Sequence, residues 1–390
     1  MHSLHPRTSL HPRTICLHSP VSQALVVILG LVLCGMMGGG PRTAQGQAGT
    51  SAADALTSSE RPVRIRLQPT YQRFEDEGRT LTQWSAPVVA VVPFRERWQV
   101  SIRGSGASAT GDNLTSLSGL SDVRTALSYT RPVGEGSLIA SASISAPVGK
   151  EELTQSEFNV ARFLSRNFYP FRVPSFGQGL GAGGGVTWAV PLTESVVVGV
   201  GGLFRYHGSY SPAANQQAEY DPGEEGRLTG GVDFQLSPVS ALSVNASYFL
   251  YGTDTVGGVD RFDAGNQLSV RVQYLQEMKQ RRIRIVGRYR QQEKSTLPLR
   301  TGADRTLQVL PTQAGIRGQY RTRLTNGIDL QVSGAGRWYD ETSAFESKTV
   351  ATVGLEPRFQ ITDGFTIAPG AAYTAGGITG IEGSIGLLAK

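Results

Sequence analysis

Hydrophobic and polar residues alternate with a period of two along most of the chain after residue 62. In residues 268–274 (LSVRVQY) the residues Leu268, Val270, Val272 and Tyr274 share one face, and residues 282–290 (RIRIVGRYR) repeat the pattern. Such alternation is typical of β-strands with one apolar face. Sixteen segments show it: 63–71, 82–92, 98–104, 123–131, 137–146, 181–190, 196–206, 228–235, 242–248, 268–274, 282–290, 314–321, 328–334, 349–359, 365–373 and 379–388.

The connections between these segments alternate between short and long. Short turns include residues 132–136, 278–281 and 362–364, whereas long polar loops lie near 105–120, 147–178, 207–226, 252–265, 291–308 and 340–348. Outer-membrane barrels have short periplasmic turns and long extracellular loops. We therefore predict an all-β fold, a transmembrane up-and-down antiparallel β-barrel of 14–16 strands, with 16 preferred, over residues 63–390.

A soluble β-sandwich or a propeller would also alternate. Sandwiches rarely reach sixteen strands in one meander, and no repeated blade motif is present in the sequence. Aromatic residues favour the membrane barrel, because Tyr289 and Trp338 lie near long loops on the apolar face and Trp98 and Phe359 lie near short turns. Two such belts bracket the apolar band of a membrane barrel.

Residues 1–48 have the features of a secretory signal peptide: early arginines, an apolar stretch and a small-residue region near Ala48. The alternative, a membrane anchor, would need an apolar run of roughly 20 residues. Residues 49–62 are predicted to be a short flexible segment. The predicted location is the outer membrane of a Gram-negative-type cell. Both cysteines and four of the five histidines precede residue 40, so His207 is the one histidine of the mature chain.

The composition excludes several classes of function. Glycine is abundant, at 48 of 390 residues, which argues against a mostly helical protein. The net charge is +6, but the arginines are scattered rather than gathered in one stripe, so no nucleic-acid partner is predicted. The sequence contains no P-loop, dinucleotide fingerprint or zinc spacing. We predict no catalytic, metal-binding or cofactor-binding residues, and no cofactor.

If the apolar face meets lipid, the other face lines the lumen, and that face is rich in arginine. The candidate lumen-lining residues are Arg64, Arg66, Arg103, Arg124, Arg205, Arg271, Arg284, Arg288, Arg290, Arg317, Arg321, Arg337, Arg358, Asp233, Asp329, Glu356 and Glu382. Rings of arginine favour anionic solutes in a pore. The structural alternative is that these arginines pair with acids of inward-folded loops, such as Asp76, Glu77, Glu157 and Glu225.

The loop over residues 149–178 is predicted to contain a short helix near 152–165. Leu153, Phe158, Ala161 and Leu164 recur at helical spacing, and a threonine at 154 with Glu157 forms a capping-box pattern. Aromatic residues follow. The loop is either a gate or lid that touches the solute, or a solvated helix on the barrel rim. The gate candidates are Phe158, Phe163, Phe168, Tyr169 and Phe171.

Three segments resemble outer-membrane transporter barrels related to the long-chain fatty-acid transporter and phenol-degradation (meta-pathway) porin families. They are residues 117–123 (LSGLSDV), 146–150 (APVGK) and 177–179 (GQG). The resemblance implies passive uptake of small, often hydrophobic, compounds. The sequence lacks a clear counterpart of the N-terminal plug of the fatty-acid transporters, and its arginine-rich inward face is a departure from them.

The sequence therefore predicts a channel or transporter, not an enzyme, for passive uptake of small hydrophobic or anionic solutes. The expected partners are outer-membrane lipid and a small-molecule solute, and the chain is either a monomer or a homotrimer. One alternative is a structural or adhesion-type barrel with an occluded lumen. A minor alternative is a lipid-modifying enzyme, because His207 and Ser209 form a His-x-Ser pair.

Overall fold

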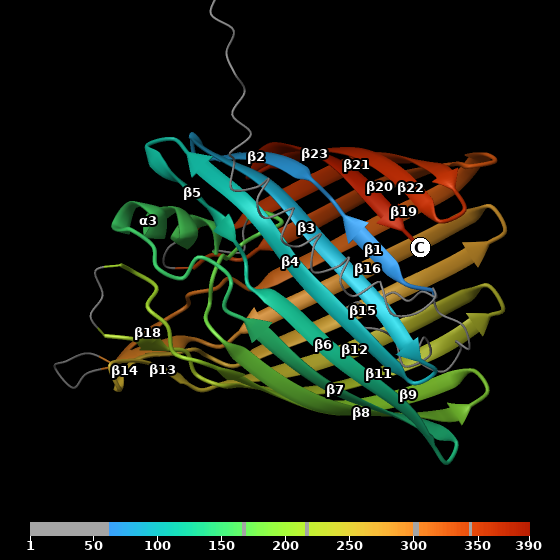
Figure 1. Cartoon of the computed structure of the whole chain (residues 1–390), viewed down its shortest axis with the longest axis horizontal. Helices are drawn as coiled ribbons and strands as arrows, with labels where there is room; N and C mark the ends of the chain where they lie inside the picture. The colour runs from blue at the N-terminus through green and yellow to red at the C-terminus, as the bar shows by residue number, and fades with distance from the viewer. Residues whose placement is uncertain (1–61, 166–168, 215–217, 299–303, 343–344) are drawn as a thin grey trace, which may run out of the picture.

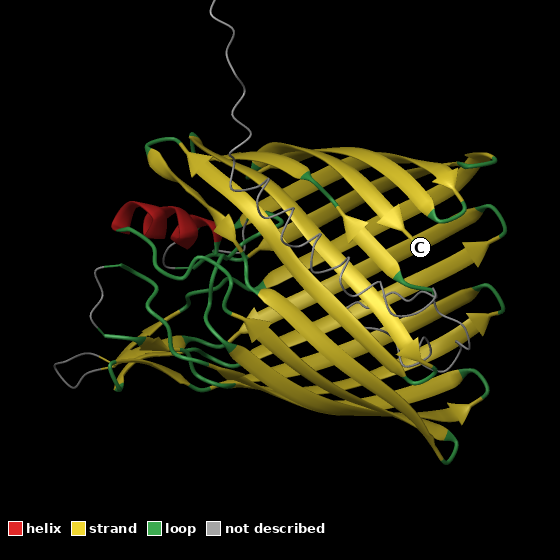
Figure 2. Ribbon diagram, in the orientation of Figure 1, coloured by secondary structure: helices red, strands yellow, loops and turns green. Residues whose placement is uncertain are grey.

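The computed structural model describes residues 62–165, 169–214, 218–298, 304–342 and 345–390. These residues form a closed antiparallel barrel of sixteen strand positions (Figures 1 and 2). The barrel wall consists of β1 (Arg64–Leu67), β2 (Thr70–Asp76), β3 (Arg79–Arg95), β4 (Trp98–Gly111), β5 (Leu114–Leu120), β6 (Val123–Val133), β7 (Gly136–Ala146), β8 (Gly181–Thr193), β9 (Val196–His207), β11 (Glu225–Ser237), β12 (Ser240–Tyr251), β15 (Gln267–Met278), β16 (Arg281–Gln292), β19 (Gln313–Thr325), β20 (Ile328–Tyr339), β21 (Lys348–Thr362), β22 (Phe365–Gly376) and β23 (Thr379–Ala389). The predicted fold class and the preferred strand number are confirmed.

Two of the sixteen positions are filled by pairs of shorter strands. β1 and β2 together lie between β3 and β23, and this pairing closes the barrel. The break between them falls at Pro69, which has no N–H to donate to a ladder. β5 and β6 both pair with β4, and the break between them falls at Ser121 and Asp122.

The two ends of the barrel differ, as predicted. Two-residue turns join the strands at one end, where β1 begins and β23 ends. The other end carries a five-stranded sheet of β10 (Tyr220–Asp221), β13 (Thr253–Val256), β14 (Val259–Asp263), β17 (Ser295–Pro298) and β18 (Asp304–Leu307). It also carries the helix α3 (Gln155–Leu164), which lies at the left of Figure 1. No helix in the described ranges is long and apolar enough to cross a membrane.

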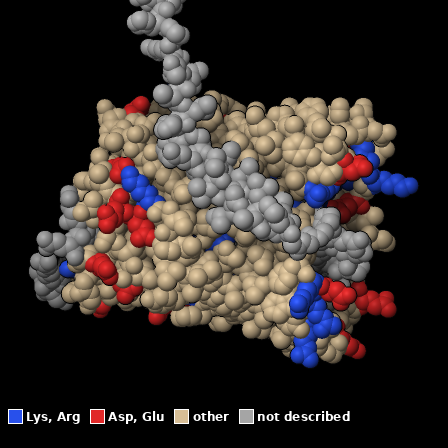
Figure 3. All heavy atoms as spheres, in the orientation of Figure 1, with Lys and Arg blue, Asp and Glu red and all other residues tan. Residues whose placement is uncertain are grey.

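The outer face of the barrel is apolar. Residues that the alternation places outward are exposed, among them Trp84, Trp188, Phe204, Val353 and Tyr373. On the face drawn in Figure 3, most charged side chains of the described residues lie near the two ends of the molecule, and few lie between them. Strands such as β9, β12 and β16 have 12 residues each. That length suffices for a tilted strand, which needs about 9–11 residues to cross a bilayer.

Some predicted boundaries were wrong. Residues 105–120 were predicted as a long polar loop, but β4 and β5 continue through them as a hairpin. The predicted polar loops near 207–226, 252–265 and 291–308 contain the paired strands of the five-stranded sheet. The predicted signal peptide and nearly all of the predicted flexible segment, residues 1–61, lie outside the described residues.

Candidate functional site

The connection between β7 and β8, residues 147–180, folds back onto inward-facing residues of the barrel wall; we call it the inserted loop. Its helix α3 begins after a capping box, in which Thr154 accepts from the Glu157 N–H and the Glu157 carboxylate accepts from the Thr154 N–H. Lys150 donates to Glu157 Oε1 at 2.5 Å. The predicted loop helix near 152–165 therefore agrees with the observed helix.

Two glutamines of the wall hold the middle of the inserted loop. Gln83 on β3 donates to the Val173 carbonyl at 2.7 Å and accepts from the Val173 N–H at 3.0 Å. Gln72 on β2 donates to the Pro170 carbonyl at 2.9 Å and accepts from the Arg172 N–H at 2.8 Å. Arg172 also forms an ion pair with Glu382 on β23. The loop backbone thus finds its hydrogen-bond partners on the lumen side of the wall.

The two ends of the inserted loop meet at Asp122, in the break between β5 and β6. Its carboxylate accepts from the Gly149 N–H at 3.0 Å and from the Gln178 N–H at 2.7 Å. Gly149 and Gly177 cross so closely that a Cβ added to Gly149 would lie 2.6 Å from the Gly177 Cα. Glycine is required at this crossing because any side chain would collide with backbone.

The inside of the barrel wall is apolar where the inserted loop packs. Phe74, Leu81, Ala107, Ala109 and Leu117 form a buried apolar cluster with residues of the loop. The loop contributes Leu153, Val160, Leu164, Tyr169, Phe171, Val173 and Phe176. Burying these side chains removes apolar surface from water, so the inside of this wall sector is a small hydrophobic core rather than a wetted surface.

The five predicted gate residues occupy different environments. Tyr169 and Phe171 are buried in this core, and the Tyr169 hydroxyl donates to Asp76 at 3.0 Å. Phe163 packs against the core, and the Arg79 guanidinium lies 5.9 Å from its ring centroid. Phe158 is exposed on the outer side of α3. Phe168 lies outside the described residues. The structure therefore brings three of the five together.

Some of the predicted lumen residues form ion pairs near the short-turn end. Arg321 pairs with Asp329, and Arg358 pairs with Glu356 at 3.3 Å. Arg66 interacts electrostatically with Glu356 and with Arg172 of the inserted loop. Glu382 holds Arg172, as described above. The predicted acids of this set therefore compensate only a part of the arginine charge.

Other arginines of the predicted set lie beside further arginines. Arg271 interacts electrostatically with Arg284 and Arg288, and the side chains of Arg271 and Arg284 share the Gln273 oxygen. Arg317 has Arg172, Arg337 and Arg288 among its electrostatic neighbours. Within the described ranges, no carboxylate forms an ion pair with Arg66, Arg124, Arg205, Arg271, Arg288, Arg290, Arg317 or Arg337.

The remaining predicted residues lie elsewhere on the wall. Arg64 is at the start of β1, opposite Val91. Arg103 faces Arg124 across β4 and β6. Asp233 is buried on β11, opposite Ser243. Three of the loop acids considered as arginine partners bind lysines instead: Asp76 and Glu77 pair with Lys348, and Glu157 pairs with Lys150.

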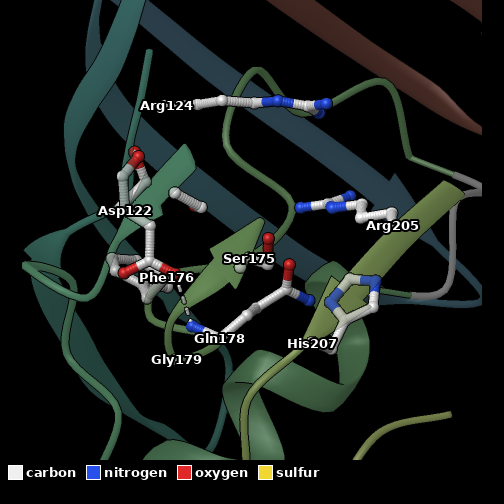
Figure 4. A pocket seen from close by; sticks show the side chains of 11 residues that line it. Asp122, Arg124, Ser175, Phe176, Gln178, Gly179, Arg205 and His207 are labelled. Carbon is white, nitrogen blue, oxygen red and sulfur yellow. Dashed lines mark hydrogen bonds between the residues drawn. The ribbon is translucent and has the colours of Figure 1, made fainter. Parts of the chain in front are cut away.

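A cavity of about 150 Å³ lies between the inserted loop and the wall. Arg124 on β6 and Arg205 on β9 line it, together with His207 at the end of β9 (Figure 4). His207 and Ser209, the pair considered for an enzyme, form no hydrogen bond with each other, and the Ser209 hydroxyl donates to Glu219 at 2.7 Å. Among the described residues, no three His, Cys, Asp or Glu side chains group as metal ligands.

The sequence analysis did not find the residues that hold the inserted loop. Gln72, Gln83 and Asp122 are ordinary polar residues on or between strands, and a polar inward residue is expected at every second position of a wetted barrel. The signal that could have indicated them is local. The signal combines Asp122, at a break between two strands, with Gly149 and Gly177 near the two ends of the long loop. This combination indicates that the two ends of the loop cross close together.

No protein-family model matches the chain, and no curated protein matches it in sequence. Similar solved structures include the CymD monoaromatic hydrocarbon channel, with 12% identity, coverage of 95% of this chain and 97% of that one, and a TM-score of 0.43. An outer membrane channel from Pseudomonas putida F1 has 9% identity, coverage of 84% and 94%, and a TM-score of 0.39. An anion-selective porin from Comamonas acidovorans has 9% identity, coverage of 84% and 98%, and a TM-score of 0.38. Similarity at this level leaves the function to be argued from the residues of the chain itself.

Proposed function

We propose that the chain is an outer-membrane channel for passive uptake of small solutes, with anions favoured and small hydrophobic compounds as a second class. The observation that carries the proposal is the combination of an apolar outer face with arginines inside the barrel that have no carboxylate partner among the described residues. Unpaired buried charge is costly, so such arginines need water or an anion beside them. Rings of arginine in a wetted pore attract anionic solutes.

The position of the arginines supports a continuous path. Arg321 and Arg358 lie toward the short turns, Arg288 and Arg317 lie in the middle of their strands, and Arg205 lies near the long loops. An anion crossing the barrel therefore meets a cation at every level of the wall. Binding at several weak sites, rather than one tight site, is what conduction requires.

Planar-bilayer recordings of the purified mature chain test the proposal. We expect discrete current steps and a reversal potential in a KCl gradient that indicates anion selectivity. The double variant R284E/R288E inverts two inward charges on β16 and should shift the selectivity toward cations. R97E is the matched control, because Arg97 is exposed in the turn between β3 and β4 and its change should leave the reversal potential near that of the wild type.

A second candidate function is a structural or adhesion-type barrel with an occluded lumen. The inserted loop favours it, since the loop is buried against the inner wall and held by Gln72, Gln83 and Asp122. If the folded wild-type barrel carries no current in bilayers, and a variant with a released loop carries none either, the lumen is occluded. That result would contradict the channel. Current in the released variant alone would identify the loop as a removable plug.

A further inference from the structure

Small residues of the wall line the cavity between the inserted loop and the barrel, among them Ser145 on β7 and Gly181 on β8. Gly181, Gly183 and Gly185 occupy alternate positions of β8, and Ser145 lies opposite Gly181 on β7. A Cβ added to Gly181 would lie 3.8 Å from an Arg205 guanidinium nitrogen. The backbone of Gly181 therefore lies beside the guanidinium of Arg205.

Two guanidinium groups lie at this cavity. Figure 4 shows Arg124 and Arg205 at the cavity from different strands, with Ser175 and the Gln178 amide of the inserted loop near Arg205. Arg124 has a 3.4 Å hydrogen bond to Ser143. Neither arginine forms an ion pair with any carboxylate of the described residues. Most of their hydrogen-bond donors are therefore available to a ligand.

Two acids lie near the pair, Asp122 and Glu225, and neither forms an ion pair with Arg124 or Arg205. Asp122 lines the cavity and interacts electrostatically with Arg205, and its two carboxylate oxygens accept the N–H groups of Gly149 and Gln178. Glu225 faces Arg205 across β9 and β11 and interacts electrostatically with Arg124, without an ion pair to either. The cavity thus keeps two convergent guanidinium groups and neutral donors from Ser145, Ser175 and Gln178.

We propose that this cavity is a binding site for the oxyanion group of a small anionic solute, of the carboxylate or phosphate type, held between Arg124 and Arg205. The inference rests on the proposed channel function and gives it a defined site. A guanidinium binds carboxylate and phosphate through two parallel N–H···O bonds, and two guanidinium groups from different strands fix the orientation of one oxyanion. Phe176 is the apolar surface on which the body of an organic acid would pack.

Isothermal titration calorimetry on the full mature chain in detergent tests the site without any current. The probes are sodium benzoate and inorganic phosphate, with sodium chloride as the control salt. We expect saturable binding of benzoate, of phosphate or of both, weakened at least tenfold in R124Q and in R205Q. Binding of benzoate alone would assign the site to carboxylates, whereas binding of both would assign it to oxyanions in general.

The matched control is R97Q, which removes the same charge from the exposed turn between β3 and β4, outside the cavity. It should retain wild-type affinity for the probe. Wild-type protein without saturable binding would overturn the site, and so would equal weakening in R97Q or full binding in R124Q/R205Q. Heat modifiability on gels verifies that each variant is a folded barrel, and the single variants carry the test if the double variant does not fold.

These experiments distinguish a failure of the proposed binding site from a failure of the proposed channel function. Saturable binding to a barrel that carries no current in planar bilayers would support the proposed binding site and contradict the channel function. Anion-selective current in a barrel that binds neither benzoate nor phosphate would sustain the channel and overturn the site.

Discussion

Gln72 and Gln83 face each other across β2 and β3, and both amides hold the same stretch of the inserted loop. Each amide donates through its nitrogen and accepts through its oxygen, so it pairs with loop backbone as a neighbouring strand would. Gln72 and Gln83 are also fully buried. The loop is therefore joined to the wall by a backbone-like ladder made of side chains.

Release of the inserted loop is the first prediction. In Q72A/Q83A the backbone groups of Pro170, Arg172 and Val173 lose their partners, and each buried polar group left unpaired costs about 1–3 kcal/mol. We expect faster proteolytic cleavage within residues 165–178 and larger, noisier current steps than in the wild type. Q331A is the matched control, because Gln331 lies on β20 and has no hydrogen bond to the described part of the loop. Equal cleavage of the wild type, Q72A/Q83A and Q331A would show that Gln72 and Gln83 do not hold the inserted loop.

The barrel itself could be predicted from the sequence, and the inserted loop could not. Alternation in segments such as 268–274 reflects the contrast between lipid and lumen, which acts on every wall strand alike. The same alternation predicts that Tyr289 points outward and that Arg288 points inward. The contacts of Gln83 with Val173 join residues far apart in the chain, and no local pattern encodes such a pairing.

The apolar patch on the inner side of the wall also could not be predicted from local sequence patterns. Phe74 contacts the rings of Tyr169 and Phe171, and Leu117 is buried in the same cluster. Both wall residues lie outside the segments in which alternation was recognised. Aromatic residues in the loop were recognised as a gate candidate, but their partners on the wall were not. Identifying the partners requires knowing that the loop turns inward, which depends on the crossing of Gly149 and Gly177.

The glycine crossing gives a second prediction. Gly177→Ala places a Cβ 2.7 Å from the Lys150 carbonyl carbon and from the Glu151 side chain, so the base of the loop must shift. We expect faster amide hydrogen exchange in residues 147–153 and weaker protection of the Gly149 N–H. Gly334→Ala is the control, since nothing lies within 4 Å of its added Cβ. Unchanged exchange in Gly177→Ala would show that the crossing does not fix the loop.

A third prediction concerns Lys348, a nearly buried lysine at the start of β21. Its ammonium pairs with Asp76 and Glu77 and lies 4.9 Å from the Phe345 ring centroid. Lys348→Met leaves the buried Asp76 carboxylate without a cation, and breaking a buried pair in this way costs about 3–5 kcal/mol. Urea unfolding in detergent should show this loss.

The double variant K348M/D76N serves as the check on that mechanism. It removes the buried negative charge and keeps an oxygen that can accept from the Tyr169 hydroxyl. We expect it to be more stable than K348M alone. If the double variant is as unstable as K348M, the loss comes from lysine packing rather than from the unpaired carboxylate.

The pH dependence of the α3 cap is a fourth prediction. Burial alone would raise the pKa of Glu157, but hydrogen bonds from Lys150 and Thr154 outweigh burial and lower the pKa. A carboxylate with a lowered folded-state pKa stabilises the fold above its unfolded-state pKa, and this stabilisation disappears as the pH falls through the folded-state pKa. Hydrogen exchange of residues 155–164, corrected for intrinsic rates, should therefore rise in acid below the ordinary glutamate range. In E157Q the corrected rates should be high at neutral pH and flat across the same window.

Glu225 gives the last prediction, because it lies opposite Arg205, one of the two arginines of the proposed oxyanion site. It faces Arg205 across β9 and β11 and interacts electrostatically with Arg124, so its negative charge opposes a bound anion. We expect Glu225→Gln to tighten benzoate or phosphate binding several-fold in calorimetry. The gain should shrink as the KCl concentration rises, since salt screens the repulsion. Glu356→Gln removes the same charge beside Arg358 and outside the cavity lining, and should leave the affinity unchanged. Tighter binding in both variants would mean that the net charge of the lumen, rather than the Arg124–Arg205 pair, sets the affinity.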